Sequence, residues 1–277
     1  MTTGPERGFV FAATGEVYVT LARRAARTLR IAIPDAEIDL FTDTPTGDPV
    51  FSQEHALSDG FFRPKMEAMR RSRFERTIML DADILVLTPI PELFDILDQY
   101  EMAGVAGISR RRKFYDPKDR IPRAIPNVNT GVLAIRRTEA TQTFLGEWNR
   151  RVRENGDRLD QPAFRKLLWE LKPKFLVLTQ EYNLMYKNFL DIWFGEMGYP
   201  RVLHVADLHR RPQGDPETPL TPEEALGRVR ANHLERLRAA DWTLGGDPAL
   251  RTPLPPPPHV QSTRSLARML VQSIRKR

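Results

Sequence analysis

Two short apolar runs with a helical pattern between them open the chain, and this order constrains the fold more than any other feature. Residues 8–13 and residues 38–42 are each typical of a buried strand. Between the two runs, apolar residues recur at the spacing of one helix face until Pro34 ends the pattern. A strand–helix–strand order is typical of a parallel sheet, so we expect an α/β fold.

The same alternation continues beyond this first unit. Further strands are predicted over residues 77–80, 84–87, 102–108, 131–135, 175–178 and 202–205, and further helices over residues 64–73, 92–97, 138–154 and 161–171. A chain of 277 residues, 41% of them hydrophobic, is long enough for one large α/β domain with an appendage. We therefore predict a mixed, mostly parallel sheet flanked by helices.

The composition changes after residue 210. Residues 211–222 contain four prolines, which is typical of a linker. Thr221 is expected to cap a helix that has proline at its first position. The apolar face of this helix is predicted to consist of Leu226, Val229, His233 and Leu237. We expect one domain over residues 1–210, followed over residues 211–277 by a proline-rich linker and a small, basic, helical extension.

The terminal segment, residues 262–277, combines an apolar stripe with five basic side chains. Helices that lie in a membrane interface have this composition, so we expect the segment to dock on anionic membrane. The alternatives are a helix packed on the protein itself and an unstructured tail. The stripe consists of Leu266, Met269, Leu270 and Ile274.

The bulk composition excludes several classes of chemistry and membrane topology. The chain has no cysteine, so disulfides, zinc thiolates and thiol nucleophiles are excluded, and a reducing compartment is favoured. No signal-peptide pattern and no run of 18 apolar residues occurs, so we expect a cytoplasmic protein, peripheral to the membrane where its tail docks. A formal net charge of +6 fits anionic partners such as nucleotides or phospholipid head groups.

The strongest signal for chemistry is the run of Asp81, Ala82 and Asp83. It follows four apolar residues at a predicted strand end, where open α/β sheets place their ligands. Residues two apart in extended chain face the same side, so the two carboxylates form one anionic oxygen site. Such a site suits Mg²⁺ or Mn²⁺ that also holds a diphosphate, and all three residues are expected to contact that ligand. The alternative is a solvated turn at the strand end.

This motif also carries a family resemblance. Residues 74–96, FERTIMLDADILVLTPIPELFDI, resemble the metal-binding segment of retaining glycosyltransferases of the glycogenin and lipopolysaccharide galactosyltransferase type, glycosyltransferase family eight. Other segments resemble that family's motifs in the expected order over residues 9–30, 61–69, 127–137, 159–169 and 201–210. The resemblance implies the GT-A fold, which is the α/β sandwich that binds nucleotide-diphosphate sugars.

The resemblance implies donor-binding roles for residues near the predicted strand ends. Ala12 and Thr14 are expected to act mainly through their backbone groups. Tyr18 is expected to stack on the base, with a place in the core as the alternative. Asp43 is expected to bind the nucleoside or else to close a turn, and Lys65 to approach the donor phosphate or else to lie at the surface.

The resemblance also places Asn129, Asp160 and Gln161 at the reacting face of the sugar. Asparagine offers a donor and an acceptor for sugar hydroxyls, and Gly131 permits close approach of the backbone. The alternatives are a turn before the next strand for Asn129 and a helix cap for Asp160 or Gln161. We assign none of the three as a nucleophile.

A late histidine supplies the third protein ligand of the metal in the family pattern. His204 fills that place after two apolar strand residues, and His209 is its rival. The chain departs from the family directly afterwards, because the usual glycine and lysine-Pro-Trp segment is missing. Arg210 or Arg211 is expected to replace the phosphate-binding lysine.

Taken together, these features predict a metal-dependent hexosyltransferase. It is expected to move a hexose from a nucleotide-diphosphate sugar, with uridine diphosphate as the family expectation, to a glycan or lipid-linked glycan, and to retain the anomeric configuration. A sugar-1-phosphate nucleotidyltransferase would need a glycine-rich loop with an arginine and a lysine, and residues 11–24 lack that loop.

Two non-enzymatic alternatives remain open. One is a catalytically inactive sugar-nucleotide-binding protein, and the intact aspartate and histidine motifs argue against it. The other is a basic protein that binds anions or nucleic acid, for which residues 110–115 are the best candidate. We interpret these residues as a loop that faces the acceptor or a membrane, and we expect no nucleic-acid partner.

Overall fold

The computed structural model describes residues 5–156 and 159–250. Contacts divide the chain into two compact units that alternate along the sequence. The first unit comprises Met1–Met185 and Arg201–Leu220, and the second comprises Tyr186–Pro200 and Thr221–Arg277. The expected domain boundary at residue 210 stays a prediction.

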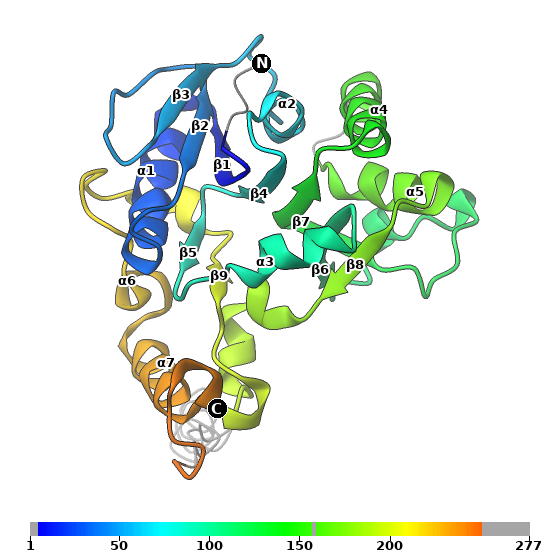
Figure 1. Ribbon diagram of the computed structural model, residues 1–277. Helices are drawn as coiled ribbons and strands as arrows, with labels where there is room; N and C mark the ends of the chain where they lie inside the picture. Colours follow the sequence, from blue (N-terminus) through cyan, green and yellow to red (C-terminus); the bar gives the residue numbers. More distant parts are fainter. Residues whose placement is uncertain (1–4, 157–158, 251–277) are drawn as a thin grey trace, which may run out of the picture. The chain divides into compact units, whose positions relative to one another are not determined.

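The elements follow the order of the predicted pattern (Figure 1). The strands are β1 (Arg7–Ala13), β2 (Ile38–Thr42), β3 (Gln53–Ala56), β4 (Arg76–Leu80), β5 (Ile84–Val86), β6 (Met102–Gly107), β7 (Asn127–Arg136), β8 (Phe175–Leu178) and β9 (Val202–His204). The α-helices are α1 (Gly15–Ala32), α2 (Lys65–Arg71), α3 (Glu92–Asp95), α4 (Glu139–Asn155), α5 (Gln161–Leu171), α6 (Pro222–Leu226) and α7 (Arg228–Ala240).

Seven strands form the main sheet, in the order β3-β2-β1-β4-β7-β6-β8. Neighbouring strands run parallel except at β7, which is antiparallel to both β4 and β6. The sheet is therefore mixed and mostly parallel, which confirms the predicted fold class. The strands β5 and β9 form a separate antiparallel pair in which Ile84 lies opposite His204.

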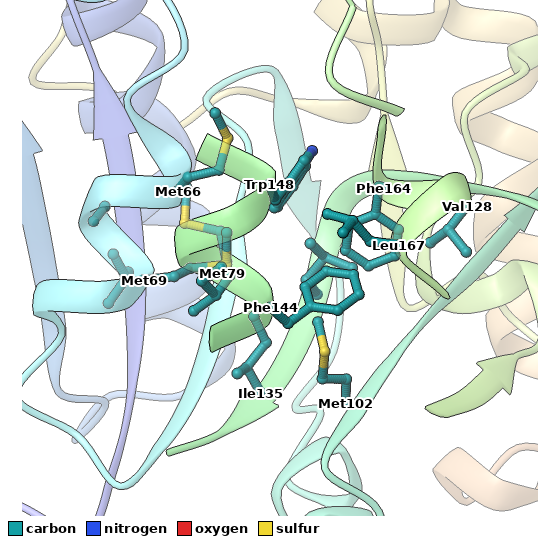
Figure 2. Packing of buried hydrophobic residues seen from close by; sticks show 14 of the residues in the cluster. Met66, Met69, Met79, Met102, Val128, Ile135, Phe144, Trp148, Phe164 and Leu167 are labelled. Atoms are coloured by element: carbon teal, nitrogen blue, oxygen red, sulfur yellow. The ribbon is translucent and has the colours of Figure 1, made fainter. Parts of the chain in front are cut away.

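Helices cover both faces of the main sheet. Successive strand residues point to opposite faces, and β1 shows the consequence. Val10 joins the large core with α2, α4 and α5, whereas Phe9 packs edge-on against Phe94 of α3 at 5.2 Å between ring centroids. In the large core, Trp148 of α4 lies edge-on to Phe164 of α5 at 4.8 Å (Figure 2). This packing fixes α2, which begins with Lys65, and α5, which begins with Gln161.

Most elements lie within a few residues of their predicted ranges, with two differences in the sheet. The strand β3 was not predicted, because its sequence is polar and lacks alternating apolar residues. The strand β7 begins at Asn127 rather than residue 131, so Asn129 and Thr130 lie inside a strand and not before it. Side chains from residues 127 to 129 are therefore placed by the ladder with β6.

The proline-rich segment after residue 210 is bound to the first unit. The guanidinium group of Arg24, which is buried in α1, donates hydrogen bonds to the carbonyl oxygens of Gln213, Thr218 and Pro219 at 2.6, 3.1 and 3.2 Å. The part of this segment up to Leu220 is therefore a packed element of the first unit and not a free linker.

The second unit contains α6 and α7 where one continuous helix was predicted. The helices are separated at Gly227, whose φ of +83° favours glycine. The break rotates the apolar pattern, so Leu226, His233 and Leu237 are buried but Val229 is 78% exposed. The prediction that Val229 belongs to the buried face is wrong.

Polar contacts fix α7 within the second unit. Nε2 of His233 donates to the carbonyl oxygen of Trp193 at 2.8 Å, and Arg230 contacts both carboxylate oxygens of Asp191 at 2.8 and 2.7 Å. Among the helices of residues 5–156 and 159–250, none has the length and apolarity to cross a membrane. The predicted basic tail, residues 262–277, lies outside the described residues.

Candidate active site

The end of β4 and the pair β5–β9 bring three predicted metal ligands together. Asp81 follows β4 directly, and its N–H donates to the carbonyl oxygen of Gly131 in β7 at 2.9 Å. Asp83 precedes β5, whose first residue, Ile84, lies opposite His204. One potential ligand atom from each of Asp81, Asp83 and His204 lies within 4.8 Å of the others. In the described ranges this group includes His204 and not its rival His209.

The imidazole ring of His204 is buried and held at both nitrogen atoms. Nε2 lies 3.1 Å from Oδ1 of Asp83. Nδ1 lies 3.1 Å from Oδ1 of Asn183, and because the amide oxygen accepts, Nδ1 is the donor. A hydrogen bond of this kind leaves Nε2 directed at the aspartates.

Gly131 makes room for that ring. A Cβ atom at residue 131 would lie 2.4 Å from both Cε1 and Nδ1 of His204. The sequence predicts a close backbone approach at Gly131, and in the structure the group that approaches is this imidazole. The glycine of the Asn-Thr-Gly segment thus leaves space for a histidine that is distant in the sequence.

Lys65 connects the metal-binding end of β4 to the first turn of α5. Its Nζ lies 2.6 Å from Oδ1 of Asp81 and 3.4 Å from Oδ2 of Asp160. Nζ also donates to the carbonyl oxygen of Thr130 at 3.2 Å. The lysine is 6% exposed, so it is not the surface residue that was the alternative reading.

The ionisation of these groups is interdependent. Burial disfavours the charged form of Lys65, but the carboxylates of Asp81 and Asp160 outweigh it and raise the pKa of Lys65. Burial likewise opposes ionisation of Asp160, and Lys65 more than compensates, so the pKa of Asp160 is lowered. Burial also raises the pKa of Asp83, but the neighbouring His204 outweighs this effect and lowers the pKa to about 2.

The net charge of the cluster suits a divalent cation. Three carboxylates, the ammonium group of Lys65 and the nearby guanidinium group of Arg63 leave an excess of one negative charge when His204 is neutral. Burial opposes protonation of His204, but Asp83 and then Asp81 outweigh it and raise the pKa of His204. Two carboxylates and one imidazole are ligands that Mn²⁺ accepts, and carboxylates also suit Mg²⁺. The residues present therefore fit the expected metal.

Asp160 and Gln161 begin α5, but neither acts as the simple helix cap that was considered. The side chain of Asp160 makes no capping hydrogen bond. It accepts instead from the hydroxyl of Thr130 at 3.3 Å and pairs with Lys65. Oε1 of Gln161 accepts from Nδ2 of Asn127 at 2.9 Å. Both side chains therefore face β7, on the side of the site where the sugar is expected.

Asn129 is buried and committed to local contacts. Its Oδ1 accepts from the N–H of Gly131 at 2.9 Å, which is the turn-like bond that was the alternative reading. Its Nδ2 lies 2.8 Å from Sδ of Met185. Gly131, which donates to Asn129, also accepts from the N–H of Asp81 and lies against His204. The contact of Asn129 with a sugar stays a prediction.

The residues predicted to bind the nucleoside lie at the ends of β1 and β2. Ala12 belongs to β1, and Thr14 follows it as the first residue before α1. Both carboxylate oxygens of Asp43 accept from the N–H of Gly15, at 3.1 and 3.0 Å, so Asp43 caps α1 from the neighbouring strand. Tyr18 is 43% exposed, so it is not a core residue.

The segment after β9 returns to this edge. The ring of His209 stacks on that of Tyr18 with centroids 5.8 Å apart and planes at 24°. Nε of Arg210 donates to Nε2 of His209 at 3.3 Å, and Arg210 is exposed. Arg211 instead contacts both carboxylate oxygens of Asp207 at 2.8 and 2.7 Å. Of the two arginines proposed for the donor phosphate, Arg210 contacts the histidine that stacks on Tyr18, and Arg211 is paired with Asp207.

The sequence analysis did not identify the residues that support the ligands. Asn183 fixes His204, Thr130 contacts both Lys65 and Asp160, and Asn127 contacts Gln161. The only available signal was position, because Asn127 and Thr130 flank Asn129 in the Asn-Val-Asn-Thr-Gly segment. Asn183 carried no signal, because it lies in an irregular segment before residue 185.

Comparisons with known proteins agree with this geometry. Residues 76–199 match the family described as Nucleotide-diphospho-sugar transferase. The glycosyltransferase GlyE of Streptococcus pneumoniae TIGR4 is similar at a TM-score of 0.53 and 18% identity, over 86% of this chain and 62% of GlyE. The bifunctional glycosyltransferase WbbM is similar at 0.52 and 13% identity, over 74% of this chain and 46% of WbbM. No curated relative matches the sequence.

These findings define the fold of the protein. The fold is the GT-A fold of nucleotide-diphospho-sugar transferases, and the matched segment includes Asp81, Asp83 and Asp160. The chain therefore has the fold of glycosyltransferases, and residues 76–199 match a nucleotide-diphospho-sugar transferase family. It spans about half of WbbM and less than two thirds of GlyE, with which it shares the fold.

Proposed function

We propose that the protein is a metal-dependent glycosyltransferase that transfers a hexose from a nucleotide-diphosphate sugar, with uridine diphosphate as the preferred carrier. The observation that carries this proposal is the convergence of Asp81, Asp83 and His204 at the end of β4. A divalent ion bound there supplies Lewis-acid stabilisation of the leaving diphosphate. The excess negative charge of the cluster favours the binding of a divalent cation.

The protein's own residues divide between two sides of this centre. On the donor side, the ends of β1 and β2 offer the backbone of Ala12 and Thr14 together with Tyr18 and Asp43. In the sheet order, β4 separates these strands from β7 and β6. We assign the nucleoside to the β1–β2 side.

On the β7 side, three polar residues are proposed to orient the sugar. Lys65 keeps Asp160 ionised and holds it beside the end of β4. Gln161 is fixed by Asn127, and Asn129 by the backbone of Gly131. Preorganised polar groups of this kind align a bound sugar without reorganisation during the reaction. Retention of configuration follows from the resemblance to retaining enzymes, and no nucleophile is assigned.

The acceptor is proposed to be a glycan or a lipid-linked glycan, and no nucleic acid is expected to bind. A cytoplasmic location with peripheral membrane contact through residues 262–277 completes the proposal. It rests on the basic and apolar pattern of that segment.

A thermal-shift panel of nucleotide sugars tests the donor. Uridine diphosphate sugars with Mn²⁺ are expected to raise the melting temperature of the wild type, and excess chelator to remove the shift. Asp83→Ala is expected to lose the shift and all donor hydrolysis. Asp95→Ala, which removes an exposed carboxylate from α3, is the matched control and is expected to behave as wild type. Full donor hydrolysis in chelator would overturn the metal dependence, and product NMR that shows an inverted linkage would overturn retention.

A further inference from the structure

A strongly basic loop joins β6 to β7 at the edge of the active site. We call residues 108–126 the basic loop. It contains seven basic residues and two acidic ones, so it carries a net charge of 7 − 2 = +5, compared with +6 for the whole chain. The basic residues are Arg110, Arg111, Arg112, Lys113, Lys118, Arg120 and Arg123.

The acidic residues near the loop do not neutralise these cations. Asp119 pairs with Lys166 of α5 at 2.8 Å, and the carboxylate of Asp116 accepts from the backbone N–H of Lys118 at 3.0 Å. Within the described part of the chain, no basic side chain of the loop forms an ion pair with a carboxylate. Arg111, Arg112 and Lys113 are exposed. The loop therefore presents an uncompensated positive surface to any anion near the site.

A buried arginine ties the base of the loop to the site. Arg165 of α5 is 2% exposed, and its guanidinium donates to the carbonyl oxygens of Ile125 and Pro122, both at 3.0 Å. The same group lies 4.4 Å from the centroid of the Tyr115 ring. The hydroxyl of Tyr115 accepts from the N–H of Asn127 at 2.9 Å.

Asn127 then links the loop to a predicted catalytic residue. Its Nδ2 donates to Oε1 of Gln161, which opens α5. Arg165 thus fixes the loop, and Gln161 contacts β7 at the proposed sugar-binding side of the site. Both residues belong to α5. The loop is held in place by this helix and does not simply extend into solvent.

The strand directions show which part of the site the loop faces. β7 runs antiparallel to both β4 and β6, so β4 and β6 end at the same edge of the sheet. The loop therefore starts at the edge that carries Asp81, and it ends where β7 begins with Asn127. The proposed nucleoside residues lie on β1 and β2, on the other side of β4. The basic loop is thus on the acceptor side of the proposed reaction centre.

We propose that the basic loop binds phosphate groups carried by a glycan acceptor. This inference rests on the proposed glycosyltransferase function and specifies the chemical class of its acceptor. Guanidinium and ammonium groups bind phosphate oxygens through charge-assisted hydrogen bonds. A phosphate held by Arg111, Arg112 or Lys113 places the rest of the acceptor toward Asn127 and Gln161.

The side chains of the loop favour a phosphorylated glycan over a lipid surface. Segments that bind membranes combine cations with an exposed apolar face. Here the Tyr115 ring lies under Arg110 at 4.8 Å, and the Phe114 ring lies under Lys113 at 5.0 Å. Both aromatic rings are half-buried and lie beside cations. Ile108, at 43%, is the one large apolar side chain of the loop that is exposed, so the loop presents no continuous apolar face.

The test compares two charge-removal variants of the full chain. The loop variant carries Arg111→Gln, Arg112→Gln and Lys113→Gln. The control variant carries Arg228→Gln, Arg236→Gln and Arg238→Gln, which remove the same charge from exposed positions of α7. Arg110 and Arg165 are left unchanged, because they support the loop structure.

The probes are a fluorescent oligosaccharide that carries phosphate groups and the same oligosaccharide after phosphatase treatment. Uridine diphosphate and Mn²⁺ are present in excess, so that the donor site does not compete for the probe. The wild type is expected to bind the phosphorylated form at least about tenfold more tightly, since three exposed ionic contacts are lost with the phosphates. The loop variant is expected to lose this preference, and the control variant to keep it.

Three outcomes would overturn the inference. The first is equal binding of the two probes by the wild type. The second is a loss of affinity in the control variant as large as that in the loop variant. The third is that only binding to vesicles of phosphatidylcholine with phosphatidylglycerol depends on the loop, which would assign the surface to lipid. Binding of uridine diphosphate with Mn²⁺ is measured by thermal shift in the same samples. Its absence would count against the proposed function alone, and the probes are then compared without nucleotide.

Discussion

Gly131 and His204 are in such close contact that no side chain can stand at residue 131 without moving the imidazole. A Cβ there would lie 2.4 Å from two ring atoms of His204. Gly131→Ala is therefore expected to displace the ring from Asp83, to weaken Mn²⁺ binding at least about tenfold and to cost about 1–3 kcal/mol of stability through overpacking.

Isothermal titration with Mn²⁺ and urea denaturation measure the two effects of Gly131→Ala. Gly146→Ala in α4 is the control, because its Cβ would approach Arg70 only to 3.9 Å. That variant is expected to keep wild-type affinity and to gain up to about 1 kcal/mol, as alanine replaces glycine inside a helix. Unchanged Mn²⁺ affinity in Gly131→Ala would contradict the supporting role of this contact.

Asn183 is expected to position the imidazole of His204 for metal binding. Asn183→Leu removes the acceptor of the Nδ1 hydrogen bond at similar volume, and Mn²⁺ affinity is expected to fall about 10- to 100-fold. Asn183→Asp keeps an acceptor oxygen and is expected to recover most of the affinity. The measurement is Mn²⁺ titration followed by electron paramagnetic resonance. Equal affinities in the two variants would show that the hydrogen bond has no such role.

Lys65 is expected to stabilise the fold as well as the site, because it separates two acidic groups. Lys65→Met leaves Asp81 and the buried Asp160 without their cation, and the free energy of unfolding is expected to fall by about 3 kcal/mol. The double variant Lys65→Met with Asp160→Asn is expected to regain part of that loss in urea denaturation. A double variant no more stable than the single one would mean that the lost stability is packing and not charge.

Asp48 is expected to make the first unit sensitive to acid. Its buried carboxylate accepts from Arg27 at 2.8 and 3.1 Å. Burial raises its pKa, but hydrogen bonds from Arg27, the N–H of Val50 and Arg23 outweigh this and lower it. A lowered folded-state pKa contributes stability that is present above the unfolded pKa of about 3.9 and is lost as pH falls through the folded value.

Asp48→Asn is therefore expected to lower the stability at pH 7 by about 2 kcal/mol, as expected for hydrogen bonds to a charged group. The difference from wild type is expected to shrink as the pH falls below about 4, where the carboxyl of the unfolded chain becomes protonated, and to be lost below the lowered folded-state pKa. Urea unfolding at a series of pH values measures it. A difference that stays constant down to acid pH would contradict the assigned ionisation.

The basic tail is predicted to bring the protein to anionic membranes. Its five basic residues are each worth about 1 kcal/mol near an anionic surface. A chain that ends at residue 261 is expected to sediment less with phosphatidylglycerol vesicles than the full chain, and equally with neutral vesicles. Equal partitioning onto the anionic vesicles would leave residues 262–277 without a membrane role.

The sequence by itself determined the elements and one half of the site. Periodicity of apolar residues located α5 and β2 at their observed bounds, because hydrophobic patterning is a local property of the chain. It also placed Asp81 and Asp83 at a strand end. It missed β3, because the sequence of that strand has no apolar pattern and the strand is defined by its pairing with β2. It also predicted one helix where Gly227 separates two.

Only the tertiary structure decided how the distant parts of the site meet. The β5–β9 pairing selects His204 rather than His209, and the sheet brings Gly131 against that histidine. The same long-range packing buries Lys65 between Asp81 and Asp160 and fixes the basic loop through Arg165. Such contacts join residues far apart in the chain, and their energies depend on burial and distance, which no local pattern of residues encodes.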